Sequence, residues 1–179
     1  MQVEETEIDG VFIVHFFNAG DDRGKFVKPF HKGDFEKHGL VSSFEESFYS
    51  ISQKGVVRGM HFQKPPFDHA KMVYCNTGKL NDVILDIRKD SKSFGKSISI
   101  ELNGNLSKGV YIPSGCAHGF EVMEDDTMMT YLTSTMHSPA HDAGILWSSF
   151  GHKWQTEDAL LSERDTQFPR LDQAENLLF

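Results

Sequence analysis

Apolar and polar residues alternate through the middle of the chain. The segment SISIEL (97–102) alternates strictly, and KMVYCNTGKLNDVILDIR (71–88) contains two apolar runs joined by an Asn-Thr-Gly turn. Further segments of this kind are GVYIP (109–113), GFEVME (119–124), MMTYLTST (128–135) and GILW (144–147). Between residues 45 and 147 the pattern predicts about seven or eight short strands, a density typical of a β-sandwich or barrel.

Helical patterns occur only near the ends of the chain. KGDFEKHG (32–39) predicts a short helix closed by Gly39, and TEDALLSERD (156–165) predicts a second with Thr156 as its N-cap. We therefore expect one all-β domain over residues 1–179, in the form of a jelly roll (a cupin-like double-stranded β-helix) with short peripheral helices. Residues 150–179 should form a C-terminal helical segment.

Composition narrows the function classes. The formal net charge is -8, and the 18 Lys and Arg residues are scattered, so we expect neither nucleic acid nor a membrane surface as a partner. The two cysteines, Cys75 and Cys116, form no Cys-x-x-Cys motif, which fits a reducing compartment. With an acidic amino terminus and no run of eighteen apolar residues, the sequence predicts a cytoplasmic protein.

Five polar side chains fall where a plain core would be expected: Arg58, His61, Lys71, His118 and Tyr131. Each alone is ordinary, because a strand histidine or lysine is usually structural and a buried tyrosine simply finds a hydroxyl partner. Together they are costly to bury without a ligand, which favours one shared pocket. An odd separation puts the first two on opposite faces of an ideal strand, and a bulge at the intervening glycine would bring both to the ligand.

Two kinds of pocket remain open at this point. His61, His69 and His118 could form the three-histidine site of a cupin metalloenzyme, such as a dioxygenase. The expected His-x-His pair is absent, because Gln63 follows Phe62, and nearby cations would oppose a metal. We favour an anion site instead, since arginine forks suit phosphate. Arg58 and Arg23 are the candidates, although Arg23 could equally form a surface salt bridge.

Several blocks of the sequence resemble one enzyme family. GVVRGMHFQ, GKLNDVILDIRKDSKSFGKSISIEL, YIPSGCAHGF, TYLTSTMHSPAHDAGILW and LLSERD resemble, in order, the successive blocks of dTDP-4-dehydrorhamnose 3,5-epimerases. The resemblance implies a jelly-roll epimerase with no metal or other cofactor and a nucleoside-diphospho-4-keto-6-deoxysugar as substrate. It also implies a homodimer whose N-terminal strands, within residues 1–45, are exchanged between subunits.

The resemblance also implies a role for each matching residue. His61 would be the base, Asp165 would orient its ring, Lys71 would donate to the ketone oxygen, and Tyr131 would be the acid on the opposite face. The substrate-binding residues implied are Arg23, Phe26, Glu46, Arg58 and His118, with both arginines on the diphosphate and His118 near the sugar.

The chain departs from the family pattern at several positions. Lys28 stands where a glutamate is usual, Glu46 and Phe48 replace glutamine and asparagine, and Tyr74 replaces an arginine. Thymidine is therefore expected from the resemblance to the family, and not from the residues at these positions. Two aromatic residues are replaced by Met136 and His137, so inversion of C3 alone or of C3 and C5 stays open, and we interpret His137 as a loop residue. A non-catalytic sugar-nucleotide-binding jelly roll is the third alternative.

Overall fold

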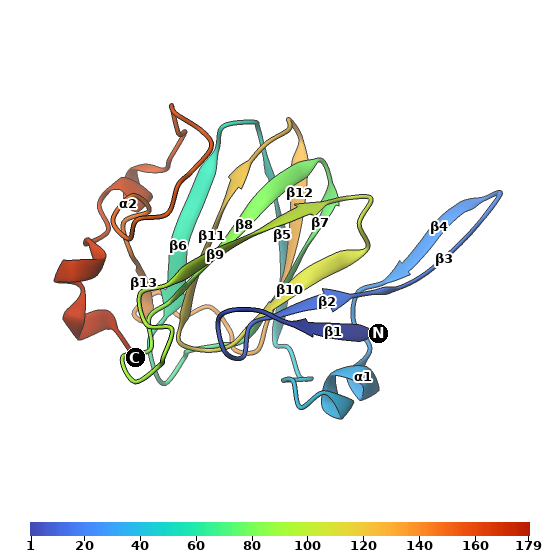
Figure 1. Cartoon of the computed structure of the whole chain (residues 1–179), viewed down its shortest axis with the longest axis horizontal. Helices are drawn as coiled ribbons and strands as arrows, with labels where there is room; N and C mark the ends of the chain where they lie inside the picture. Colours follow the sequence, from blue (N-terminus) through green and yellow to red (C-terminus); the bar gives the residue numbers. More distant parts are fainter.

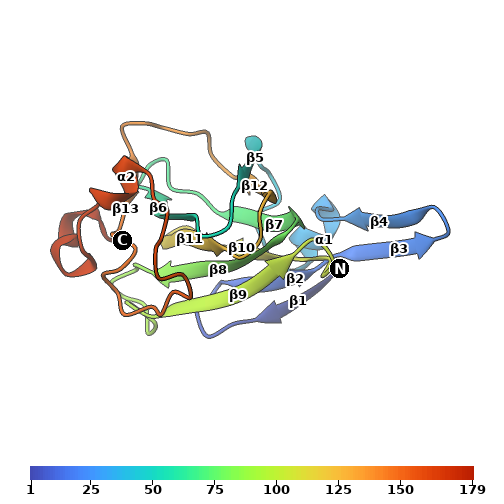
Figure 2. The same ribbon diagram turned by 90° about the horizontal axis from the view of Figure 1, so that it is seen from above.

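A computed structural model describes residues 1–179 as two antiparallel sheets that face each other (Figures 1 and 2). The six-stranded sheet has the order β1 (Gln2–Glu5), β2 (Phe12–His15), β10 (Lys108–Ile112), β7 (Lys71–Thr77), β12 (Thr127–Thr133) and β5 (Glu46–Ser52). The five-stranded sheet has the order β13 (Asp142–Gly144), β6 (Val57–Gln63), β11 (Cys116–Val122), β8 (Lys79–Asp86) and β9 (Ser97–Asn103). This architecture confirms the predicted all-β jelly roll.

The chain repeatedly crosses from one sheet to the other, and the Asn-Thr-Gly turn is one such crossing. β7 pairs with β10 and β12, whereas β8 pairs with β9 and β11, so the two strands do not form a hairpin. Gly78 turns the chain with a φ of +73°. A β-carbon there would overlap Thr127, so the crossing requires glycine.

The predicted strands between residues 45 and 147 are present, and the structure adds detail at their ends. Nine strands occupy this region, from β5 to β13. β10 ends just before Pro113, as expected, since proline cannot donate to a strand ladder. The strand predicted at 144–147 instead covers Asp142–Gly144, because the Leu146 amide donates to Pro169 in the C-terminal segment rather than to a strand.

One predicted helix is confirmed and the other is wrong in extent. Helix α1 covers Lys32–Lys37, with Gly39 following at a φ of +70°. Helix α2 covers only Glu163–Thr166, and its N-cap is Ser162 rather than Thr156. The residues before it form no helix, and Leu160 instead makes a parallel β-bridge in which it bonds to the backbone on both sides of Val56.

The C-terminal segment is therefore mostly irregular rather than helical. After α2 it contains two short 3₁₀ turns, η1 (Leu171–Gln173) and η2 (Glu175–Leu177). Its apolar side chains pack on the five-stranded sheet; they include Phe150, Trp154, Leu171, Leu177, Leu178 and Phe179. Burial of these apolar side chains holds the segment, and with it α2, against β6 and β13. No helix is long and apolar enough to cross a membrane.

The N-terminal region has two parts with different surroundings. β1 and β2 extend the six-stranded sheet of their own chain through β10. β3 (Phe17–Asp21) and β4 (Gly24–Lys28) pair only with each other and project from the body (Figures 1 and 2). Phe17 and Phe26 are more than half exposed on this hairpin. Large exposed aromatic residues on a projecting hairpin are typical of a surface that meets another protein.

Candidate active site

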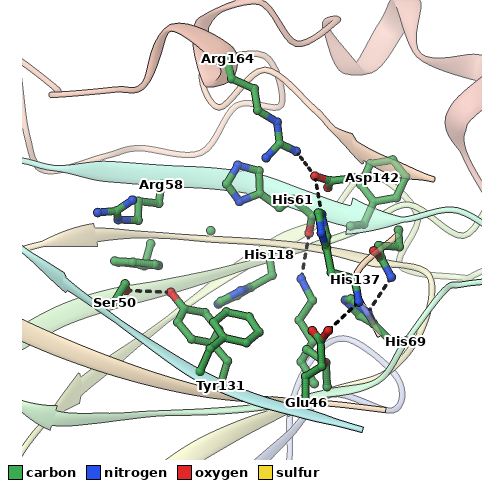
Figure 3. A pocket seen from close by; sticks show the side chains of 17 residues that line it. Glu46, Ser50, Arg58, His61, His69, His118, Tyr131, His137, Asp142 and Arg164 are labelled. Carbon is green, nitrogen blue, oxygen red and sulfur yellow. Dashed lines mark hydrogen bonds and ion pairs between the residues drawn. The ribbon is translucent and has the colours of Figure 1, made fainter. Parts of the chain in front are cut away.

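A pocket of about 280 Å³ lies between the two sheets (Figure 3). One wall comes from β5, β7 and β12 of the six-stranded sheet, and the other from β6, β11 and β13 of the five-stranded sheet. Its lining is mostly polar and consists of Glu46, Phe48, Ser50, Arg58, His61, Phe62, Gln63, His69, Lys71, His118, Gly119, Phe120, Tyr131, Thr133, His137, Asp142 and Arg164. The clustering predicted for five polar side chains is therefore present.

Arg58 and His61 both face this pocket because β6 contains the bulge that their odd separation required. His118 on β11 lies opposite His61, whereas Phe120 lies opposite Arg58, so β6 has one extra residue between these pairs. Gly59 within the bulge has a φ of +131°, and a β-carbon there would lie 2.5 Å from the Gly119 Cα. The strand thus bends only because this position has no side chain.

His61 is paired with a buried carboxylate from α2. Its Nε2 lies 2.8 Å from Asp165 Oδ1, and the other carboxylate oxygen accepts from the Gly59 amide at 3.1 Å. Burial opposes ionisation of Asp165, but the hydrogen bonds from His61, from the Gly59 amide and from the Ser162 side chain outweigh it and hold its pKa below the usual value. A carboxylate only accepts, so in the neutral imidazole Nε2 is the donor nitrogen and Nδ1 is the one with the lone pair.

Lys71 is the buried cation of the pocket. Its ammonium donates to the backbone oxygen of His61 at 3.2 Å. Burial lowers the pKa of Lys71 to about 8, although the negative charges of Asp142 and Asp82 act in the opposite direction. Near neutral pH the group is therefore still charged, in a place where water is largely excluded.

Tyr131 on β12 faces the pocket from the sheet opposite His61. Its hydroxyl lies 3.2 Å from Ser50 Oγ, and its ring stacks on Phe48 at 4.7 Å between centroids. Burial raises the pKa of Tyr131, so the phenol keeps its proton at neutral pH. His118 lies beside it, with ring centroids 6.1 Å apart.

His118 is itself held by a second buried carboxylate. Its Nε2 lies 2.6 Å from Asp82 Oδ1, and both side chains are almost fully buried. Burial lowers the pKa of His118 despite the opposing effect of Asp82. Asp82 was not predicted from the sequence; the signal was an aspartate on the apolar strand NDVILD, where an unpaired carboxylate would be costly.

Arg58 is available for an anion. Its Nε donates to Ser52 Oγ at 3.0 Å, and it makes no ion pair with a carboxylate. An arginine fixed through Nε still presents its two terminal amino groups, which suit phosphate oxygens.

A polar group at the rim includes residues that the sequence analysis did not single out. Asp142 Oδ2 accepts from Arg164 at 2.7 Å and lies 3.2 Å from His137 Nε2, and Glu46 accepts from the His137 amide at 3.0 Å. His137 is in the loop after β12, as expected, but it also lines the pocket. Arg164 directly precedes Asp165 in the sequence, and this adjacency was the available signal.

Two predicted binding residues do not reach the pocket of their own chain. Arg23 and Phe26 lie on the projecting β3–β4 hairpin, where Arg23 is paired with Asp21 and its side chain is 90% exposed. Neither residue lines the pocket. The sequence could not show this, because hydrophobic patterning does not give the direction in which a hairpin leaves the body.

The three histidines considered as metal ligands do not form a cluster. No group of three or more His, Cys, Asp or Glu side chains has the arrangement of a metal site. His69 Nδ1 lies 3.2 Å from Gln63 Nε2, and burial lowers the pKa of His69 to about 3. His61 and His118 each direct Nε2 to a carboxylate. These contacts suit two separate His–Asp pairs rather than a shared ligand sphere.

Comparisons with known proteins point to one family. Residues 5–173 match the family model described as dTDP-4-dehydrorhamnose 3,5-epimerase. A protein of that name from Shigella flexneri is 39% identical, with 92% of this chain and 93% of the relative covered. A dTDP-4-dehydrorhamnose 3-epimerase from Streptomyces niveus is 33% identical, with 92% and 81% covered.

A solved structure is also similar over nearly its whole length. It is dTDP-6-deoxy-D-glucose-3,5-epimerase from Legionella pneumophila in complex with dTDP-4-keto-L-rhamnose, with a TM-score of 0.94 and 30% sequence identity. The match covers 99% of this chain and 96% of that chain.

Proposed function

The chain belongs to the dTDP-4-dehydrorhamnose 3,5-epimerase family and is a carbohydrate epimerase, and from this premise we propose its substrate and mechanism. The proposed reaction converts dTDP-4-dehydro-6-deoxyglucose to dTDP-4-dehydrorhamnose by inverting C3 and C5. One observation carries the mechanism: the carboxylate-paired His61 and the protonated Tyr131 line the same pocket from opposite sheets. A base on one face and an acid on the other are what inversion requires.

His61 is the proposed base. The hydrogens at C3 and C5 are acidic because each carbon adjoins the C4 ketone, and the resulting enolate places negative charge on oxygen. Nδ1 has the free lone pair, and Asp165 on Nε2 stabilises the imidazolium that forms when a proton is taken up. The proposed reaction needs no cofactor, because side chains supply each step.

Lys71 is the proposed partner of the ketone oxygen. A cation fixed before the reaction stabilises the enolate more than the ketone, which lowers the barrier. The pKa of about 8 supports this role, because the ammonium is still charged at neutral pH. Its hydrogen bond to the His61 backbone oxygen keeps it beside the base.

Tyr131 is the proposed acid that returns a proton to the opposite face. Its raised pKa supports this role because the phenol is protonated at the start of each turnover. His118, held by Asp82 and adjacent to Tyr131, is the proposed sugar contact. A binding module has no need of this base, cation and acid together, which argues against the non-catalytic alternative.

The remaining binding residues support a dimer. We propose that Arg58 binds the diphosphate and that Arg23 and Phe26 reach the pocket of a second subunit on the projecting hairpin. β5 is the edge strand of its sheet and exposes Phe48, Tyr49 and Ile51, so a partner's hairpin has an apolar surface to meet. Glu46 lies on the same strand and is the proposed contact for the nucleotide base.

A cytoplasmic location is part of the proposal. Both cysteines are free and buried, at positions where no disulfide joins them. Unpaired cysteines are typical of proteins from reducing compartments.

Deuterium incorporation tests the proposed reaction. The enzyme should be incubated in heavy water with the thymidine, uridine, guanosine and cytidine diphosphate derivatives of the 4-keto-6-deoxyhexose. The proton signals at C3 and C5 should be followed by NMR. We expect loss of both proton signals and formation of the rhamno product with the thymidine compound. Exchange at C3 alone would identify a 3-epimerase, and no exchange with any of the four would contradict the proposed function.

A further inference from the structure

Three side chains surround the proposed acid, Tyr131. Phe48 on β5 lies directly opposite it in the strand ladder, and the two rings stack with their centroids 4.7 Å apart and their planes 14° apart. The His118 ring meets Tyr131 at a steep angle of 71°, and Ser50 Oγ lies 3.2 Å from the phenol oxygen (Figure 3). Of the three neighbours, only Phe48 covers the Tyr131 ring in a parallel stack.

The hydrogen bond to Ser50 holds the phenol only weakly. Its 3.2 Å is longer than the separation of about 2.7–2.8 Å that is usual between two hydroxyl groups. An acid must also leave such a partner when it gives its proton to the sugar. The orientation of the Tyr131 ring therefore depends on its aromatic contacts, and a stacked pair is favourable beyond the area that it buries.

Phe48 also separates Tyr131 from solvent. β5 is the edge strand of its sheet, so no further strand of this chain lies outside it. Phe48 is 47% exposed, whereas the stacked Tyr131 is only 9% exposed. Asparagine, the usual residue of the family at this position, has no ring to stack. This cover of the acid is therefore a feature of the phenylalanine in this chain.

We propose that Phe48 is a positioning residue for the acid: by stacking on Tyr131 it holds the phenol toward the sugar, so that the proton returns on the face opposite His61. The inference rests on the proposed epimerase function. Two other roles compete with it. Phe48 lines the pocket and could contact the substrate, and it belongs to the exposed surface of β5 that a partner's hairpin could meet.

The three roles differ in what they change. In heavy water, proton removal by His61 gives deuterium exchange, and proton return by Tyr131 gives inversion. A misplaced acid leaves proton removal intact, and deuterium then returns from the side of His61 without inversion. The ratio of inversion to exchange thus reports the position of the acid. A substrate ligand instead acts mainly on KM, and an interface residue acts on the oligomeric state.

Phe48→Leu tests the proposal, because leucine keeps most of the apolar volume but has no flat face. Phe48→Tyr keeps the stacking ring. Phe94→Leu is the matched control, since Phe94 is similarly exposed at 42% and lies outside the pocket. We expect Phe48→Leu to lower the ratio of inversion to exchange about tenfold, with the exchange rate almost unchanged, because the acid alone is misplaced. Phe48→Tyr and Phe94→Leu should match the parent.

The Tyr131 ring gives a readout that is independent of turnover. In protein labelled in the tyrosine rings, its NMR signals are assigned by their loss in Tyr131→Phe. A stacked ring lies in the ring current of its neighbour, so the Tyr131 ring protons should resonate upfield in the parent. Phe48→Leu should move them downfield, and Phe48→Tyr and Phe94→Leu should leave them in place.

Several results would overturn the inference. A parental ratio of inversion to exchange in Phe48→Leu, together with a raised KM, would make Phe48 a substrate ligand. An equal loss of exchange and inversion in a variant that light scattering shows to be monomeric would make it an interface residue. Unmoved Tyr131 signals in folded Phe48→Leu would show that the stack does not orient the ring. If the parent shows no deuterium exchange, the proposed function fails, while these signals still decide whether Phe48 orients Tyr131.

Discussion

His61 Nε2 and Asp165 Oδ1 lie 2.8 Å apart although 104 positions separate the two residues in the sequence. The bulge at Gly59 turns His61 toward the pocket, and the same glycine's amide binds the second carboxylate oxygen. One backbone feature therefore places both the base and its orienting group. This coupling is the basis of the predictions about the base.

Replacing the orienting carboxylate should reduce turnover without removing the base. In Asp165→Asn the amide cannot stabilise an imidazolium by charge, and it can also hold His61 in the wrong tautomer. We expect kcat for epimerisation to fall about a hundredfold or more, with the dissociation constant of dTDP almost unchanged. Asp172→Asn, at an exposed ion pair in the same segment, is the control. A variant that retains parental kcat would remove Asp165 from the mechanism.

The ionisation of Lys71 should appear in the pH dependence of activity. Because its pKa is about 8, kcat/KM should decline above that pH as the ammonium loses its proton. Lys71→Met lacks this group, so its low residual rate should show no such decline. If kcat/KM of Lys71→Met shows the same decline at alkaline pH, another residue is responsible for the decline.

The same group should make stability depend on pH. In the unfolded chain the lysine pKa is 10.5, and in the folded protein it is about 8, so between these values the unfolded state binds more protons. Folding therefore becomes more favourable as pH rises from 8 to 10.5. Lys71→Met should raise the free energy of unfolding by up to about 3 kcal/mol at pH 7 and lose this advantage near pH 10.5. Urea unfolding at several pH values measures the difference.

Gly59→Ala should strongly destabilise the fold. The added methyl group would lie 2.5 Å from the Gly119 Cα and 2.9 Å from the His118 oxygen, in a backbone conformation that L-residues rarely adopt. We expect the free energy of unfolding to drop by about 3 kcal/mol or more. Gly151→Ala has a positive φ of +77° and nothing within 4 Å, so it isolates the backbone strain, about 1 kcal/mol. Equal losses in both variants would show that the close approach to β11 is unimportant.

Mixing two impaired variants, at a substrate concentration too low for the Arg23→Ala homodimer to turn over, tests whether the hairpin serves a partner's pocket. Arg23→Ala should weaken substrate binding and His61→Ala should abolish turnover, each in a homodimer. A mixed dimer has one pocket in which His61 and the partner's Arg23 are both intact, so activity should return after the two variants are unfolded and refolded together. No recovery in a mixture shown to contain heterodimer would place Arg23 outside the neighbouring site.

The sequence supported the strands and much of the site because strand alternation and glycine chemistry are local. The odd spacing of Arg58 and His61 around a glycine was enough to expect the bulge. The extended path around Leu160 was not predictable, because its backbone partners lie about a hundred positions earlier, near Val56. Asp82 and Asp142 were missed for the same reason, since the role of a carboxylate depends on the cation or histidine that folding brings to it.

Position-resolved exchange in single turnovers tests the central claim, that His61 and Tyr131 act from opposite faces of the sugar. In heavy water the parent should give inverted product with deuterium at each inverted carbon. His61→Asn should give neither exchange nor inversion, whereas Tyr131→Phe should exchange deuterium at the same carbons with the original configuration largely retained. Normal inversion by Tyr131→Phe, or exchange at parental rates by His61→Asn, would contradict the assignment of base and acid.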